Sequence, residues 1–350
     1  MSQSMLDQTL QLPNRTRRSE SIPRRLVAEG KYHLLPVYAL LTTSDLAREG
    51  IRNSGSFRFA DHIYRNEPSG RYGVGRVLDS VLLKLRGARS MRSRFFHSRR
   101  EVLRAIREIG LSDGIQLRFG QATLEAKQAD SQEGIARLRP ASTELKQGAD
   151  SFAAGTLGAF LAESGDFHTG SWDAENTADQ ITVVSVPCGI ARDLLEVAET
   201  LELAEPSLWE RVGFVGIDLD PEALELSRDL VGGQLGFEFR CADALEPGSI
   251  PAGVDVIVSL GFGEFLSDDV LLGFYRRCRA SLNDGGRFIT SAMSRDRLSD
   301  YLARELAELH THYRSREQLI ELLESAGFAR VRTTRDKVGL QTLAVGERVA

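Results

Sequence analysis

A tight turn that contains Gly189 and an aspartate that closes the next apolar run, Asp218, are well placed to bind a ligand. The run ITVVS at 181–185 breaks into this turn, and a helix is expected to begin near Ala191. Glycine lets the backbone approach a ligand closely, and the free N–H groups of a helix N-terminus attract an anionic group. Asp218 ends the run VGFVGID at 212–218 and can accept hydrogen bonds from ribose hydroxyls. Together these features predict a site for an adenosine-containing cofactor.

The turn itself indicates which cofactor is bound. Its sequence at 186–191 is VPCGIA, with one glycine, whereas a dinucleotide site requires the pattern G-x-G-x-x-G to admit a pyrophosphate. Pro187 and Ile190 would crowd that group. A ligand with a methionine tail and one carboxylate requires less room, so the turn favours S-adenosylmethionine over NAD.

The elements that must position these residues alternate along the chain. A strand of near-continuous apolar residues, VDVIVSLGFGEF, is expected where both faces of a sheet are covered. The chain ends with two strand-like runs whose spacing suits an antiparallel hairpin, which is not part of the dinucleotide-binding plan. The elements expected after Asp218 are the strands 237–245, 254–265 and 282–293, the helix 316–328 and the hairpin strands 329–335 and 340–349.

With these elements in order, residues 181–350 resemble a class I S-adenosylmethionine-dependent methyltransferase. More narrowly, the chain is similar to bacterial methyltransferase-like proteins sometimes found fused to an α/β-hydrolase, through FADHIYRNEPSGRYGVGRVLD at 59–79 and SLGFGEFL at 259–266. The resemblance implies an α/β fold with a Rossmann-like seven-stranded methyltransferase sheet and a C-terminal antiparallel hairpin. It implies S-adenosyl-L-methionine as cofactor and methyl transfer as activity, but no particular substrate.

The resemblance also assigns cofactor contacts by position. Two residues depart from the family pattern, because Ser185 replaces an acidic residue and Pro187 replaces the first glycine. Arg192 could compensate by pairing with the cofactor carboxylate. The assigned contacts are Val186, Cys188 and Gly189 at the methionine end, Asp218 at the ribose, Leu219, Asp243 and Ala244 at the adenine, and Leu260 and Gly261 beneath the sulfonium.

Two aspartates compete for the cap of the helix expected at 221–230. Asp220 lies directly before Pro221 and is the better N-cap, because proline is favoured at the first helical position. This choice leaves Asp218 free for the ligand.

Four side chains are candidates for contact with the methyl acceptor, and a base is needed only where the acceptor loses a proton. Glu264 matches the family, but a solvated carboxylate at a helix N-terminus is an equal alternative. His310 and His312 lie between the fifth and sixth strands, where an exposed pair is the competing interpretation. Tyr64 could fold over the site or pack in a helical core.

Other chemistries find little support in the sequence. The fourth strand ends in SLGF, not in the Asn/Asp-Pro-Pro-Tyr/Phe pattern that holds a flipped base, so base methylation is not favoured. No His, Cys or Asp cluster has metal-ligand spacing, and three scattered cysteines give no disulfide framework. The longest apolar stretch, HLLPVYALL, is too short to span a bilayer, and no signal peptide is seen, so we expect a cytoplasmic protein.

Charge is divided unequally along the chain. Residues 1–109 carry 21 Lys and Arg against 10 Asp and Glu, a net of +11, while the remainder carries 23 against 39, a net of −16. Composition predicts four segments: a flexible tail at 1–30, a helical N-terminal cap at 31–113, a polar, partly disordered insert at 114–180 with a short helix at 155–164, and the methyltransferase domain at 181–350.

The basic stretch 84–107 has nine Lys and Arg against one acidic residue. It could pack against the acidic domain, bind an anionic headgroup, carrier-bound acyl substrate or membrane surface, or bind RNA. RNA ranks last because no RNA-binding module is present and the Phe95–Phe96 pair is a thin stacking platform.

We therefore expect methyl transfer to a hydroxyl, carboxyl or amine of a small-molecule or lipid-like acceptor. The alternatives are a non-enzymatic cofactor-binding regulatory or scaffold protein, an RNA methyltransferase that uses the basic segment, and a nicotinamide oxidoreductase. The helical segment is expected to cover the strand ends as a lid, with Tyr64, Arg65, Arg71 and Arg76 facing the site.

Overall fold

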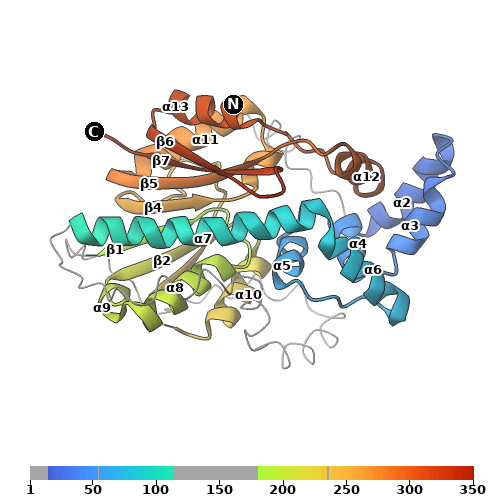
Figure 1. Cartoon of the computed structure of the whole chain (residues 1–350), viewed down its shortest axis with the longest axis horizontal. Helices are drawn as coiled ribbons and strands as arrows, with labels where there is room; N and C mark the ends of the chain where they lie inside the picture. Colours follow the sequence, from blue (N-terminus) through green and yellow to red (C-terminus); the bar gives the residue numbers. More distant parts are fainter. Residues whose placement is uncertain (1–14, 54, 113–179, 235) are drawn as a thin grey trace, which may run out of the picture. The chain divides into compact units, whose positions relative to one another are not determined.

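The computed structural model describes residues 15–53, 55–112, 180–234 and 236–350 (Figure 1). The chain divides into two units, of which one combines Met1–Asp113 with Asn176–Ala350 and the other is Gly114–Glu175. The second unit, the expected polar insert 114–180 apart from its last residue, and the expected helix at 155–164 lie outside the described residues.

The sheet has seven strands in the order β3-β2-β1-β4-β5-β7-β6. The first five strands in this order are parallel, and β7 runs antiparallel between β5 and β6. This arrangement confirms the predicted α/β fold, seven-stranded sheet and C-terminal hairpin. The strands are β1 Ile181–Ser185, β2 Val212–Asp218, β3 Phe237–Cys241, β4 Val254–Ser259, β5 Leu282–Met293, β6 Ala329–Arg335 and β7 Gln341–Glu347.

Helices cover both faces of the sheet, which is why its central strands are apolar throughout. One face carries α7 (Arg86–Ser112), α8 (Arg192–Ala204) and α10 (Pro221–Val231), with the short α9 (Pro206–Trp209) between β1 and β2 (Figure 1). The other face carries α11 (Asp268–Ser281) and α13 (Arg316–Ser325), which bury Phe274, Tyr275, Leu319 and Leu323 in the main core.

Shorter helices precede α7 and lie beyond one end of the sheet, beside α12 (Figure 1). They are α2 (Arg15–Ala28), α3 (Leu34–Leu41), α4 (Asp45–Arg52), α5 (Phe57–Arg65) and α6 (Tyr72–Lys84), and α12 spans Arg297–Ala307. Within the expected tail 1–30, Arg15–Ala28 forms helix α2, whose Ile22 and Leu26, spaced four apart, are fully buried in a cluster with Leu306. A two-residue apolar face is too short to stand out in the sequence.

The long helix α7, the last helix of the expected cap 31–113, packs against the sheet. Its residues Val102, Ala105 and Ile106 are buried, while its arginines pair with glutamates of the acidic domain. Arg107 Nε donates to Glu205 at 2.7 Å, and Arg99 pairs with Glu196. Of the three interpretations of the basic stretch, the structure therefore supports packing on the acidic domain.

None of the helices in the described part of the chain has the length and apolar content needed to cross a bilayer. Within the same residues, no group of three or more His, Cys, Asp and Glu side chains could hold a metal ion.

Candidate functional site

The turn after β1 is fastened to the end of β2. Gly189 has a φ of +54°, a value that favours glycine, and its N–H donates to Asp218 Oδ2 at 2.7 Å. One residue earlier, Cys188 N–H donates to the carbonyl of Ile217 at 2.8 Å. The two bonds bring the glycine turn and the carboxylate to one edge of the sheet, as the sequence predicts.

Asp218 has a second bond that shapes the next helix. Its Oδ1 accepts from Asp220 N–H at 2.9 Å, and Asp220 in turn caps α10 by accepting from Glu222 N–H at 3.0 Å. Asp220 as N-cap is thereby confirmed. Burial raises the pKa of Asp218, and the N–H groups of Asp220 and Gly189 partly offset that rise.

The first turn of α8 carries another acid beside the glycine turn. Burial raises the pKa of Asp193 to about 6, although the N–H of Leu194 donates to its carboxylate. Burial also raises the pKa of the Cys188 thiol, and the carboxylates of Asp218 and Asp193 raise it further. The turn thus carries a thiol that keeps its proton, next to the N-terminus of α8.

Beyond Asp218 the residues assigned to adenine differ in access. The side chain of Leu219 is 52% exposed, whereas Ala244 is buried in the main core. Asp243 is partly buried and accepts from Leu245 N–H at 2.8 Å. Val186, assigned to the methionine end, is fully buried. Leu219 and Asp243 therefore offer side chains to a ligand, while Ala244 and Val186 can offer only their backbone.

A second polar group lies at the end of β4 and centres on Arg94 of α7. Its guanidinium is 2.8 Å from where a Cβ on Gly261 would stand, so glycine is needed at that position. Arg94 Nη1 donates to Glu264 at 3.0 Å, and Nη2 donates to the Tyr64 hydroxyl at 3.1 Å. Gln341 Nε2 donates to the same Glu264 oxygen at 3.2 Å. The four side chains come from four separate segments of the chain.

Arg94 is only 5% exposed, and its Nε has no hydrogen-bond partner among the described residues. Burial opposes its charge, but Tyr64 and Glu264 outweigh that effect and hold the pKa of Arg94 above its usual value. Two fully buried serines, Ser90 and Ser98, lie one turn before and one turn after it on α7. Their small side chains leave room for the guanidinium between the helix and the sheet.

Helix α5 lies over the glycine turn. The Cβ of Phe57 is 3.2 Å from where a Cβ on Gly189 would stand, and Asp61 accepts from Arg192 Nε at 2.8 Å. Arg192, expected at the cofactor carboxylate, is thus engaged by Asp61. The segment covers the site through Phe57, Asp61 and Tyr64.

The arginines expected to face the site from the same segment are exposed instead. Arg65 pairs with Glu67 at 3.0 Å, and Arg76 donates to the carbonyl of Pro68 at 3.4 Å. Arg71 is exposed directly before α6. The covering surface of the N-terminal segment is therefore aromatic and acidic rather than basic.

The side chains of His310 and His312 are exposed and do not join the polar group around Arg94. The backbone N–H of His312 donates to the carbonyl of Glu264 at 2.8 Å, but its side chain is exposed. His310 is exposed and lines a different hollow, among the ion pairs of Arg25 and Lys31 with Glu305. Leu260 is partly buried, and the next residue, Gly261, donates its N–H to Ser291 Oγ at 3.2 Å. The structure thus brings Tyr64 and Glu264 together and leaves both imidazoles outside.

The sequence motifs described above do not include Arg94, Gln341 or Phe57. For Arg94 the sequence does contain an indication of burial, because the pattern Ser90-x3-Arg94-x3-Ser98 places two small residues on one helix face with a cation between them. No comparable pattern marks Gln341 or Phe57, whose roles depend on contacts across the fold.

No protein-family model and no curated protein matches the chain. Over its whole length it is similar to the crystal structure of a possible exported protein from Bordetella parapertussis, with 19% identity, complete coverage of both chains and a TM-score of 0.64. About half of it is similar to the S-adenosylmethionine-dependent methyltransferase SibL, with 19% identity, 51% and 53% coverage and a TM-score of 0.41. It is also similar to human N-acetylserotonin methyltransferase in complex with SAM, with 15% identity, 48% coverage of each chain and a TM-score of 0.36. The chain thus shares its overall fold with the possible exported protein, and its likeness to the two methyltransferases is distant.

Proposed function

We propose that this protein binds S-adenosylmethionine at the strand ends that carry Gly189, Asp218 and Gly261. We further propose that it transfers the methyl group to a hydroxyl, carboxyl or amine of a small-molecule or lipid-like acceptor. The observation that carries the proposal is the 2.7 Å hydrogen bond between Gly189 N–H and Asp218. It joins a glycine turn, a helix N-terminus and a half-buried carboxylate at the carboxyl ends of adjacent parallel strands, where open α/β sheets bind ligands.

The residues at both ends of this site fit such a cofactor. At one end Leu219 is exposed beside Asp218, which suits an adenine ring and a ribose. At the other end the Nη atoms of Arg94 lie beside Gly261, and its buried Nε has no partner among the described residues. A carboxylate on the amino-acid part of the ligand would satisfy that donor, and a charge-assisted bond of this kind is about twice as strong as a neutral one.

When bound, the cofactor supplies a methyl group already activated by a sulfonium. The protein's part is then to orient and cover the reactants, and orientation in well-placed reactions is worth roughly 7–11 kcal/mol. In this proposal Asp218 accepts from the ribose, Arg94 holds the carboxylate, and Phe57 and Tyr64 exclude water. Glu264 acts as a positioning residue, because it bonds to both Arg94 and Gln341.

A thermal-shift panel on the full chain tests cofactor choice. S-Adenosylhomocysteine at a hundred times its dissociation constant should add about 2.7 kcal/mol to the free energy of unfolding, whereas NAD and NADP should add none. Stabilisation by NAD alone would contradict the proposal. Incubation with S-adenosylmethionine carrying a radioactive methyl group, followed by extraction of small molecules and lipids from a cell extract, tests transfer itself.

A non-enzymatic cofactor-binding protein is the second candidate, and one observation favours it. Phe57 lies over Gly189 and Arg94 lies over Gly261, so the chain's own side chains cover both glycines. Stabilisation by S-adenosylhomocysteine without methyl transfer to any component of the extract would favour this candidate over an enzyme.

A further inference from the structure

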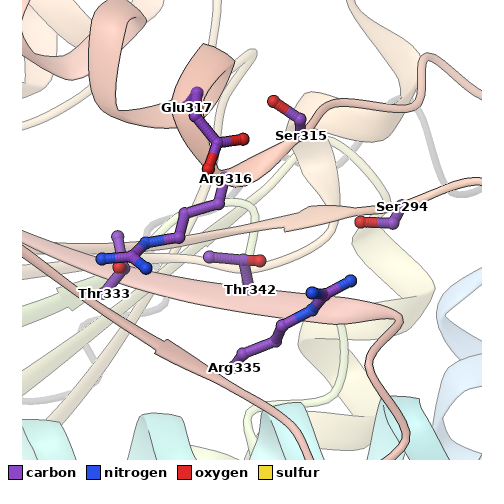
Figure 2. Close-up of a pocket in the computed structure, with 7 residues that line it drawn as sticks. All are labelled: Ser294, Ser315, Arg316, Glu317, Thr333, Arg335 and Thr342. Carbon is purple, nitrogen blue, oxygen red and sulfur yellow. The ribbon is translucent and has the colours of Figure 1, made fainter.

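A cavity of about 220 Å³ lies between the N-terminus of α13 and the hairpin of β6 and β7 (Figure 2). It lies apart from every residue assigned above to the cofactor or the acceptor. The side chains that matter for its chemistry are Ser294, Arg316, Glu317, Thr333, Arg335 and Thr342.

The hairpin brings two hydroxyls to one face of the sheet. Thr333 and Arg335 are two residues apart on β6 and so share a face, and Thr342 of β7 stands opposite Arg335 in the register. Thr342 is 1% exposed, and no hydrogen bond joins its hydroxyl to a described residue. The hydroxyl of Thr333 is buried and likewise lacks a partner in the described part of the chain. Buried polar atoms are normally bonded, so the two hydroxyls leave this cavity with hydrogen-bond donors that a ligand could use.

Two guanidinium groups flank these hydroxyls. Arg316 and Arg335 lie on opposite sides of Thr342 in Figure 2. Arg335 Nη2 donates to the carbonyl of Gly339 at 2.8 Å, while Arg316 is exposed and makes no ion pair within the described residues. Both cations are therefore available to an anion in the cavity.

One acidic residue, Glu317, also lines the cavity and contributes to its net charge. Glu317 lies in the first turn of α13, where its own backbone N–H and the Ser315 hydroxyl lower its pKa and keep it ionised. With Arg316 and Arg335, the lining carries a net charge of +1. Glu317 is exposed and weakens, rather than cancels, the attraction of the cavity for an anion.

We propose that this cavity binds the oxyanion group, a phosphate or a carboxylate, of a small ligand. The hydroxyls of Thr333 and Thr342 donate to the oxyanion, and the guanidinium groups of Arg316 and Arg335 neutralise it. The proposal is independent of cofactor binding, because it uses none of the residues at the ends of β1, β2 and β4.

Isothermal titration of the full chain at constant ionic strength tests the proposal, with inorganic phosphate, phenyl phosphate and benzoate as probes. Thr342→Val removes the donor while keeping the volume, and it should weaken binding roughly ten-fold or more. The matched control is Thr334→Val, which alters an exposed threonine on the opposite face of β6 and should bind as the wild type does. Phosphate probes that bind more tightly than benzoate identify a phosphorylated ligand, and the reverse order identifies a carboxylate.

Two further variants test the proposal even if the Thr342→Val protein does not fold. Arg316→Gln should weaken binding of whichever probe the wild type binds, and Glu317→Gln should tighten it by roughly two-fold, because it removes a competing charge. The proposal is overturned if the wild type binds none of the three probes, or if Thr342→Val and Arg316→Gln both bind as tightly as the wild type. Equal losses in Thr342→Val and Thr334→Val would overturn it as well.

Discussion

The two ends of the candidate cofactor site are built in different ways. The end at β1 and β2 uses backbone N–H groups and one aspartate, Asp218, and its parts belong to one strand–helix–strand unit, with Gly189 and Asp218 29 residues apart. The end at β4 uses a buried cation, Arg94, held by Tyr64, Glu264 and Gln341, which come from segments far apart in the chain. The first end needs only one strand–helix–strand unit, whereas the second exists only when the whole unit has folded.

The difference has consequences for stability. At the β1–β2 end, burial raises the pKa values of Asp193 and Asp218, so ionised carboxylates are disfavoured there. At the β4 end, a buried ion pair is kept by mutual attraction, and removal of one partner leaves the other without compensation. The β4 end should therefore be the more sensitive of the two to substitution.

The largest expected effect is at Arg94. Arg94→Leu leaves the carboxylate of Glu264, which is 13% exposed, without its cation and should lower the free energy of unfolding by about 3–5 kcal/mol in urea titrations. Arg104→Leu is the matched control on the same helix, because Arg104 is exposed and pairs with Glu108, and it should cost no more than about 0.5 kcal/mol. Equal effects at the two positions would remove the contrast between the buried pair and the surface pair.

Next in size is a pH effect at the β1–β2 end. Because the pKa of Asp193 is raised from 3.8 to about 6, the folded state holds its proton more tightly than the unfolded state does. The stabilising contribution is complete below about pH 4 and is lost as pH rises through about 6, by up to about 3 kcal/mol. Asp193→Asn should flatten the stability profile between pH 4 and 7, and an unchanged slope would show that Asp193 is not the titrating group.

The smallest expected effects separate the two neighbouring aspartates. Asp218→Ala should weaken binding of S-adenosylhomocysteine by about 1.5–3 kcal/mol, because it removes the ribose acceptor and releases the N–H of Gly189. Asp220→Ala should cost about 1 kcal/mol of stability through the lost cap and leave affinity unchanged. Calorimetric titrations and urea unfolding of both variants would expose an exchange of the two roles.

The same contrast explains what the sequence could predict. The strand predicted at 329–335 has the bounds of β6, because the strand-like run and the Gly339 turn lie within a few residues of one another. The Asp220 cap follows from the adjacent Pro221. The Gly189 turn and Asp218 are likewise separated by one strand–helix–strand unit, so their meeting follows from the topology.

Features that depend on distant contacts could not be predicted in this way. The strand expected at 254–265 ends at Ser259, because Gly261 adopts a φ of +76° and a 3₁₀ turn follows over Phe262–Phe265. Arg94 looked like one more surface arginine in a basic stretch, since its burial depends on Tyr64 and Glu264. Helix α2 could not be foreseen because Ile22 and Leu26 find their apolar partners in α3, α4 and α12.

In the proposed complex, the β1–β2 end holds the adenosine part of the cofactor and the β4 end holds its carboxylate. Isothermal titration with S-adenosylhomocysteine and with 5′-methylthioadenosine, which lacks the amino-acid part, tests it most directly. The wild type should bind S-adenosylhomocysteine roughly ten- to a hundred-fold more tightly. Arg94→Gln should abolish that difference, whereas Asp218→Ala should weaken both ligands and preserve it. Equal affinity of the wild type for the two ligands, or no binding of either, would contradict this assignment of the two ends.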